Sequence, residues 1–205
     1  DMLGYETGDK LLKYWADEIN KGLREGELFC RVSADNVTTL TYYEDEEALW
    51  NAFEEMDAIL KNYPGFKEQD FRPELVSGVY ILDDEDIKSP NINAIMDKAN
   101  IAKKSVKALT GSKMALYSES MREKQLRELE ISQHLEEGLR KKEFYIVLQP
   151  QYNYSTNEIV SAEALVRWEH SDLGAIYPDE FIPLLERAGL ITELDKYVWE
   201  EACKF

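Results

Sequence analysis

Apolar side chains near the start of the chain recur at helical spacing. The residues of this stripe are three or four positions apart: Leu12, Trp15, Ile19 and Leu23. The spacing predicts a helix that begins near Asp9, whose side chain is suited to cap it. Two runs rich in β-branched and aromatic residues follow, 28 to 32 and 37 to 43, and residues 33 to 36 between them carry turn chemistry. They predict a β-hairpin.

Three more elements follow in the same kind of pattern. A second stripe has helical spacing: Leu49, Phe53, Met56 and Leu60. It ends at Pro64 and Gly65, which do not continue a helix. Residues 75 to 82 predict a strand, and after the polar stretch 83 to 91 apolar residues return at helical spacing from 92 to 109. The order helix, hairpin, helix, strand, helix predicts a compact α/β domain, expected to lack its beginning.

Residues 116 to 142 differ from the rest in being dense in charge. Opposite charges stand four positions apart, a spacing that supports a helix: Glu123 and Arg127, Glu136 and Arg140, and Glu137 and Lys141. This segment predicts a linker helix over 118 to 142. Its apolar residues do not keep a strict heptad, so we expect a packed connector rather than a long coiled coil.

The last part of the chain predicts strands at 144 to 149 and 159 to 166, and helices at 178 to 188 and 193 to 205. Two strands and two helices are too few to close a domain. We therefore expect residues 143 to 205 to be the first part of a larger one.

Charge narrows the classes of partner. The chain carries 41 acidic and 24 basic residues, a formal net charge of −17. This charge repels nucleic-acid backbones and anionic membrane surfaces, so nucleic acid is not an expected partner and a phosphate ligand must rely on local cations or metals. Cys30 and Cys203 lie far apart, which argues against a zinc site or disulfide framework and predicts a cytoplasmic location. A sensory or membrane region upstream stays compatible with the sequence.

Two predicted strands carry side chains suited to phosphodiester chemistry. Alternation along a strand places Glu163, Leu165 and Arg167 on one face, and Gln149 ends the strand before. A carboxylate is a preferred ligand of Mg²⁺ or Mn²⁺, and a guanidinium grips phosphate through its planar fork. An ordinary ion pair between Glu163 and Arg167 is the alternative interpretation.

Residues 143 to 205 resemble the first part of an EAL domain, the family that hydrolyses cyclic di-GMP. Three runs carry the resemblance in order and spacing: FYIVLQPQ, AEALVRWEH and PDEFIPLLERAGLI. It implies the opening strands and helices of a (β/α)8-type barrel, with Glu163 as a metal ligand, Arg167 on the substrate phosphate and Gln149 lining the same site. The family's other metal ligands and its catalytic lysine lie in later segments. We therefore expect hydrolysis to pGpG only from a longer protein.

Residues 1 to 115 resemble the GGDEF domain of diguanylate cyclases, an α+β domain like a cyclase palm. The runs GDKLL at 8 to 12 and NAIMDKANIAKKSVK at 93 to 107 carry the layout. Where the family has Gly-Gly-Asp-Glu-Phe, this chain has Ser33-Ala34-Asp35-Asn36-Val37. Cβ atoms fill the space that glycines leave for a triphosphate, and Asn36 removes one carboxylate. The resemblance implies an inactive cyclase-like domain in which Asp35 is the remaining candidate metal ligand.

Three further residues are candidates for nucleotide binding in this domain. Asp9 occupies the family's guanine-binding position, with a helix N-cap as the alternative. Arg24 and Glu27 stand where the family has an inhibitory Arg-x-x-Asp that binds cyclic di-GMP, with a solvated helix end as the alternative. The two histidines, His134 and His170, lack companion ligands and are expected at the surface.

These patterns together predict a cyclic di-GMP signalling protein of mixed α/β fold. Its EAL part is expected to hydrolyse cyclic di-GMP, and its degenerate GGDEF part to regulate, with GTP as a further candidate ligand. One rival is a non-catalytic receptor for cyclic di-GMP, and another is a structural module that binds no nucleotide. A homodimer is compatible with each of these.

Overall fold

The computed structural model describes residues 4 to 66 and 73 to 204 and divides the chain into two compact units, Asp1–Met121 and Arg122–Phe205. Phe205, to which the last helix was predicted to extend, lies outside the described residues. The fold is mixed α/β, as predicted. No described helix has the length and apolar character needed to span a membrane.

The first unit contains the helices, hairpin and strand that were predicted, together with three short elements that were not. Its elements in chain order are α1 (Gly4–Gly22), β1 (Leu28–Ser33), β2 (Asn36–Leu40), α2 (Glu46–Lys61), the 3-10 turn η1 (Pro64–Phe66), β3 (Val76–Val79), α3 (Asp84–Lys88), α4 (Ile92–Val106) and β4 (Lys113–Leu116).

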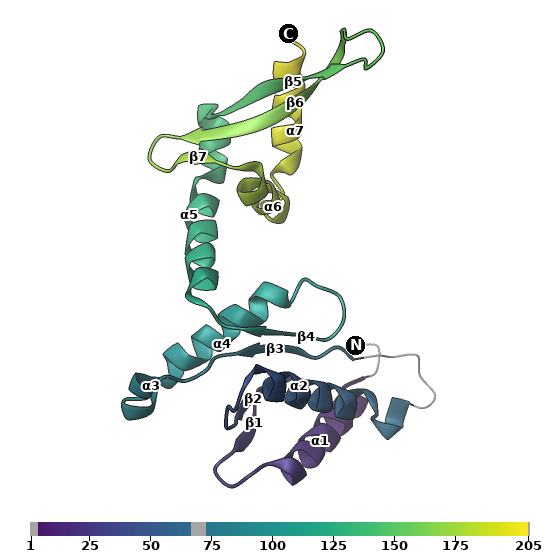
Figure 1. Cartoon of the computed structure of the whole chain (residues 1–205), viewed down its shortest axis with the longest axis vertical. Coiled ribbons are helices and arrows are strands. Elements are labelled where there is room, and N and C mark those ends of the chain that lie inside the picture. Colours follow the sequence, from purple (N-terminus) through teal and green to yellow (C-terminus); the bar gives the residue numbers. More distant parts are fainter. Residues whose placement is uncertain (1–3, 67–72, 205) are drawn as a thin grey trace. The chain divides into compact units, whose positions relative to one another are not determined.

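Helices α1 and α2 pack through their apolar stripes beside the β1–β2 hairpin (Figure 1). Trp15 is buried, and its indole N–H donates to the Met56 carbonyl at 2.8 Å, which ties α1 to α2. The helix α1 begins at Gly4, so Asp9 lies inside it. The prediction that Asp9 caps this helix was wrong, because the helical backbone starts five residues earlier.

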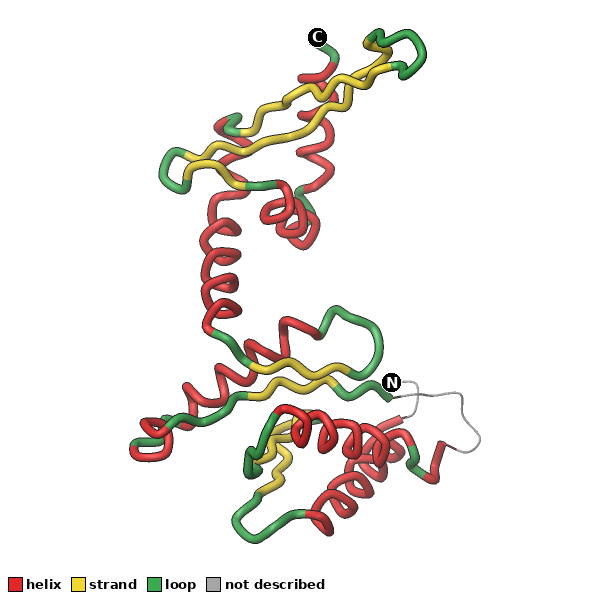
Figure 2. Tube along the Cα trace, in the orientation of Figure 1, coloured by secondary structure: helices red, strands yellow, loops and turns green. Residues whose placement is uncertain are grey.

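Strands β3 and β4 pair in parallel, and α4 packs against them (Figure 2). Strand β4 was missed because its four residues are too few to show a period. Helix α3 was missed inside a polar stretch. Its signal is a capping box, in which the Asp83 side chain accepts from the N–H of Asp86 and the Asp86 side chain accepts from the N–H of Asp83.

The second unit is built from the charged helix and a long hairpin. Its elements are α5 (Glu119–Lys141), which begins just before the boundary, then β5 (Phe144–Tyr152), β6 (Ile159–His170), β7 (Gly174–Ile176), α6 (Pro178–Ala188) and α7 (Ile191–Ala202). The three strands form an antiparallel sheet in the order β5-β6-β7. An ideal (β/α)8 barrel has parallel strands only, so the hairpin departs from that pattern.

One face of the β5–β6 hairpin is covered by α6, α7 and the C-terminal half of α5 (Figure 1). Trp168 is the centre of this core, stacked on Phe144 at 4.7 Å between ring centroids and edge-on to Phe181 at 5.7 Å. On α5, Ile131 and Leu135 are buried in the same core. The expected packed connector is therefore present over the second half of the helix.

His170 is buried, contrary to the expectation of a surface position. Strand β6 runs four residues further than predicted, so His170 falls on the core face with Trp168. Its ring lies 4.5 Å from that of His134, and its Nδ1 accepts the backbone N–H groups of Asp172 and Leu173 at 3.1 and 3.2 Å. The imidazole thus holds the turn that leads to β7.

Candidate functional site

The register of the β5–β6 hairpin brings the predicted EAL residues together. Gln149 lies directly opposite Glu163 in the antiparallel ladder. Leu165 lies opposite Val147, and Arg167 opposite Tyr145, and the ladder is regular over this stretch. Alternation along each strand puts these three cross-strand pairs on one face. The sequence predicted the shared face of Glu163 and Arg167, and the register adds Gln149 to it.

This face is the one that the helices leave open. Phe144 and Trp168, on the opposite face, are each 1% exposed, whereas Gln149 and Glu163 are exposed and Arg167 is half-buried. Side chains on this face are therefore not part of the core that the helices form with the hairpin. We refer to the pairs Gln149–Glu163, Val147–Leu165 and Tyr145–Arg167 as the open hairpin face.

The two functional ends of the open hairpin face are well separated. Glu163 and Arg167 are four residues apart along the strand, which corresponds to about 13 Å at ~3.3 Å per residue. No ion pair joins them in the part of the chain that the structure describes. Instead, Arg167 Nη1 donates to the Val166 carbonyl at 2.8 Å. An ordinary Glu163–Arg167 ion pair is therefore not what places these residues here.

The donors at one end of the face fit a hard divalent cation in kind but not in number. Glu163 offers a carboxylate, and the Gln149 side chain beside it offers an amide oxygen, and oxygen ligands are those that Mg²⁺ and Mn²⁺ prefer. Among residues 4 to 66 and 73 to 204, no three His, Cys, Asp or Glu side chains gather closely enough to hold a metal. Further ligands would have to come from elsewhere.

Polar groups of the turn at residues 33 to 36 are engaged by protein partners. Lys103 Nζ donates to Asn36 Oδ1 at 2.8 Å, and Asn36 Nδ2 lies 3.5 Å from Asp35 Oδ1. Asp35 itself is exposed. Lys103 was not among the predicted site residues. The ammonium of Lys103 is thus partnered with a neutral amide rather than a carboxylate.

Arg31 links Asp9 to the backbone of the turn that carries Asp35. Its Nη1 and Nη2 donate to Asp9 Oδ1, both at 3.3 Å, and its Nε donates to the Ala34 carbonyl at 2.6 Å, one residue before Asp35. Asp9 and the turn thus share one partner, which sequence reasoning missed. The signal for Arg31 was weak, because a cation three residues before a turn is common.

Ala34 keeps a backbone conformation that favours glycine, with φ at +42°. The left-handed region costs a non-glycine residue about 1–2 kcal/mol, and the extra freedom of glycine in the unfolded chain offsets ~0.5–1 kcal/mol of that. We therefore expect Ala34→Gly to raise the free energy of unfolding by about 0.5–1 kcal/mol, measured by urea denaturation. Ser33→Gly, at a residue outside this region, should be neutral or destabilising. If Ala34→Gly lowers the free energy of unfolding, the backbone strain inferred at Ala34 is contradicted.

Arg24 and Glu27 bind each other in a tight turn just after α1. Glu27 accepts from the Arg24 backbone N–H at 2.8 Å and from its Nε at 3.0 Å, and it also accepts from the Tyr42 backbone N–H at 3.2 Å. Arg24 Nη1 donates to Glu44 at 2.7 Å. Both charges are engaged by protein groups, and the Glu27 side chain is only 5% exposed, whereas the Arg24 side chain stays 54% exposed, as the alternative of a solvated helix end expects.

These contacts lower the pKa of Glu27, chiefly through the Arg24 backbone N–H. Because the pKa is lowered in the folded state, ionised Glu27 stabilises the fold fully at pH values above the ordinary pKa of about 4.5. This contribution is lost as the pH falls through the folded pKa. We expect Glu27→Gln to lower stability at pH 7 and to flatten its decline between about pH 5 and pH 3. Urea denaturation across this range measures both. The curve of unfolding free energy against pH for Glu25→Gln should run parallel to that of the wild type. A parallel curve for Glu27→Gln would contradict the stabilising role of ionised Glu27.

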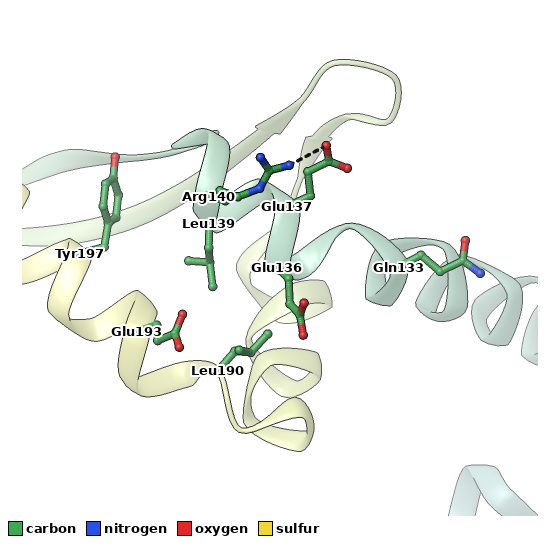
Figure 3. Close-up of a pocket in the computed structure, with 8 residues that line it drawn as sticks. All are labelled: Gln133, Glu136, Glu137, Leu139, Arg140, Leu190, Glu193 and Tyr197. Atoms are coloured by element: carbon green, nitrogen blue, oxygen red, sulfur yellow. Dashed lines mark hydrogen bonds and ion pairs between the residues drawn. The ribbon is translucent and has the colours of Figure 1, made fainter.

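The second unit also has a groove whose lining includes no residue of the open hairpin face (Figure 3). It lies between α5 and the start of α7 and is lined by Gln133, Glu136, Glu137, Leu139, Arg140, Leu190, Glu193 and Tyr197. Arg140 donates to Glu137 at 3.3 Å. Three carboxylates against one guanidinium repel a phosphate, so the groove does not suit a nucleotide.

Two family models together match most of the chain. The model described as the diguanylate cyclase GGDEF domain matches residues 1–113, and that of the EAL domain matches residues 132–205. The chain is 25% identical over 204 residues to the cyclic di-GMP phosphodiesterase NbdA of Pseudomonas aeruginosa. The alignment covers 100% of this chain and 26% of NbdA. It is also 25% identical over 205 residues to the bifunctional diguanylate cyclase/cyclic di-GMP phosphodiesterase MucR of that organism. This alignment covers 100% of this chain and 29% of MucR. The chain thus spans between a quarter and a third of these relatives' length.

Solved structures of similar proteins match more loosely. The S helix-GGDEF-EAL part of Vibrio cholerae LapD, bound to c-di-GMP, is 17% identical, with 98% of this chain and 46% of that one covered and a TM-score of 0.40. The PaMucR phosphodiesterase in complex with c-di-GMP is 34% identical, with 36% of this chain and 30% of that one covered and a TM-score of 0.35.

Proposed function

Because the chain belongs to the GGDEF family and continues into an EAL domain, we propose that it is part of a cyclic di-GMP signalling protein whose EAL domain hydrolyses cyclic di-GMP to pGpG. The names of NbdA and MucR, both cyclic di-GMP phosphodiesterases, support this substrate and reaction. The observation that carries the proposal is the register of the hairpin, in which Gln149 faces Glu163 on the side of the strand that also carries Arg167.

Each side chain has a role that its chemistry suits. Glu163 would hold Mg²⁺ or Mn²⁺, and Gln149 beside it would orient the ligand or add one amide oxygen to the donors. A divalent cation held by Glu163 would make hydroxide available at neutral pH and would offset negative charge on the phosphoryl group. Arg167 swings from the Val166 carbonyl to a phosphate oxygen, where its fork forms charge-assisted hydrogen bonds.

The GGDEF part has a regulatory role in this proposal. Ser33, Ala34 and Asn36 replace residues that the family uses to hold a triphosphate and metals, so synthesis of cyclic di-GMP is not expected. Asp9 and Asp35 remain, with Arg31 close to both, and GTP is the ligand we assign to this region. We place the protein in the cytoplasm, in agreement with its two free cysteines, and a homodimer is part of the proposal.

The rival is a receptor that binds cyclic di-GMP without cleaving it. It draws support from the open hairpin face, which offers a metal one carboxylate only. The test is to incubate the full-length protein with cyclic di-GMP and Mg²⁺ or Mn²⁺ and to separate the products. We expect pGpG, and no product after chelation of the metal. Binding without pGpG would favour the receptor, and the absence of binding would contradict both.

A further inference from the structure

Tyr145 lies on the open hairpin face, on the strand next to that of Arg167. It is 46% exposed, directly opposite Arg167, and on the same face as Gln149 and Glu163. Resting on the proposed function, we propose that Tyr145 is a substrate-binding residue of the EAL site. Its ring stacks on a guanine base of cyclic di-GMP while Arg167 holds the neighbouring phosphate.

The spacing of the face indicates a ligand with two anionic groups and planar parts. Each cross-strand pair follows the last at about 6.6 Å, so the Tyr145–Arg167 pair lies ~13 Å from the Gln149–Glu163 pair. A small phosphodiester cannot reach both ends. A cyclic dinucleotide, with two phosphates and two bases, places one phosphate near Glu163 and presents the rest of the molecule to the other end.

The chemistry of the far end suits a base next to a phosphate. Residues directly opposite in an antiparallel pair have Cβ atoms about 4.5–5.5 Å apart, so the ring of Tyr145 and the guanidinium of Arg167 can meet adjacent groups of one ligand. Bases stack well on aromatic side chains, and a phosphate pairs with a guanidinium. Between the ends, Val147 and Leu165 form an apolar pair on which the sugar can rest.

Unlike Tyr197 of the same unit, the Tyr145 side chain has no hydrogen-bonding role in the part of the chain that the structure describes. Tyr197 donates its hydroxyl to the Phe144 carbonyl at 2.5 Å, and so ties α7 to β5. For Tyr145, no side-chain hydrogen bond or ring contact is present within the residues that the structure describes. Tyr152, 58% exposed on the same strand, lies beyond the register irregularity and opposite Ile159, away from Arg167. Tyr152 is therefore the matched control.

The experiment compares two substrates in the full-length protein and in its Tyr145→Ala, Tyr145→Phe and Tyr152→Ala variants. The substrates are cyclic di-GMP and bis(p-nitrophenyl) phosphate, a phosphodiester too short to span the face. We expect Tyr145→Ala to raise KM for cyclic di-GMP about tenfold and to change the rate on the small substrate less than about twofold. Tyr145→Phe keeps the ring and should restore KM, and Tyr152→Ala should match the wild type.

The outcomes separate this inference from the function on which it rests. If the wild type cleaves cyclic di-GMP and Tyr145→Ala leaves KM unchanged, or impairs both substrates equally, the role of Tyr145 is refuted and the function stands. If the wild type binds cyclic di-GMP without cleaving it, a tenfold rise of Kd in Tyr145→Ala supports the stacking role, and an unchanged Kd refutes it. If the wild type does not bind cyclic di-GMP, both proposals fall.

Discussion

Glu163→Gln is expected to lower the rate of cyclic di-GMP hydrolysis by the full-length protein at least about 100-fold. The substitution keeps the size and hydrogen-bonding capacity of the side chain but removes the charge that binds the cation. Glu163 is the only acidic residue of the open hairpin face as defined above. The exposed Glu169 alternates onto the same face of β6, but it lies six residues from Glu163, about 20 Å along the strand, and so cannot replace it.

The matched control is Glu169→Gln, on the same strand and also exposed. Glu169 lies opposite Ala175 of β7, away from Gln149. Its variant should hydrolyse cyclic di-GMP at nearly the wild-type rate. Product formation is measured over a series of Mn²⁺ concentrations, because a weakened metal site shows as a higher metal requirement. A Glu163→Gln protein that keeps more than about a tenth of the activity would refute the metal role.

Gly78→Ala is expected to give the largest loss of stability in the first unit, more than about 3 kcal/mol. Gly78 lies in β3 where α4 crosses closely. A Cβ built on it would be 2.0 Å from the Ala99 carbonyl oxygen and 2.3 Å from the Lys103 nitrogen. Both are backbone atoms of a helix, so the helix and strand must move apart.

The control for Gly78→Ala is the same change at Gly8, inside α1. Apart from its own stretch of helix, no described atom lies within 4 Å of a Cβ there, and alanine is the better helix former, so Gly8→Ala should be neutral or stabilising by up to about 1 kcal/mol. Urea denaturation of both variants provides the comparison. If Gly78→Ala unfolds within 1 kcal/mol of the wild type, the close packing of α4 on β3 is contradicted.

Helices were predictable from the sequence where an apolar stripe faced a core. The stripes of α1 and α2 meet in one cluster around Trp15 and Leu60, so their spacing reflected real packing. Boundaries were less predictable. Helix α1 starts before its first apolar residue, and its first turn owes nothing to the apolar stripe. Asp9 was consequently mistaken for a cap, although its partner is Arg31 on a strand 22 residues away.

The candidate site was predictable in part. Period-two alternation is a property of any strand, so it placed Glu163 and Arg167 on one face without knowledge of the fold. The position of Gln149 depends on register, and register depends on how the hairpin tip closes. Here Asn153 accepts the N–H groups of Ser155 and Thr156, and Asn157 adopts a φ of +54°. Those contacts, with an irregularity between Gln151 and Tyr152, decide that Gln149 meets Glu163.

The most direct test is a crystal structure of the full-length protein with cyclic di-GMP and Mn²⁺. We expect a metal ion bound to the Glu163 carboxylate, with Gln149 beside it and the Arg167 guanidinium on a phosphate of the ligand. A metal and ligand bound elsewhere, with Glu163 and Arg167 touching neither, would contradict the assignment of the open hairpin face as the catalytic surface.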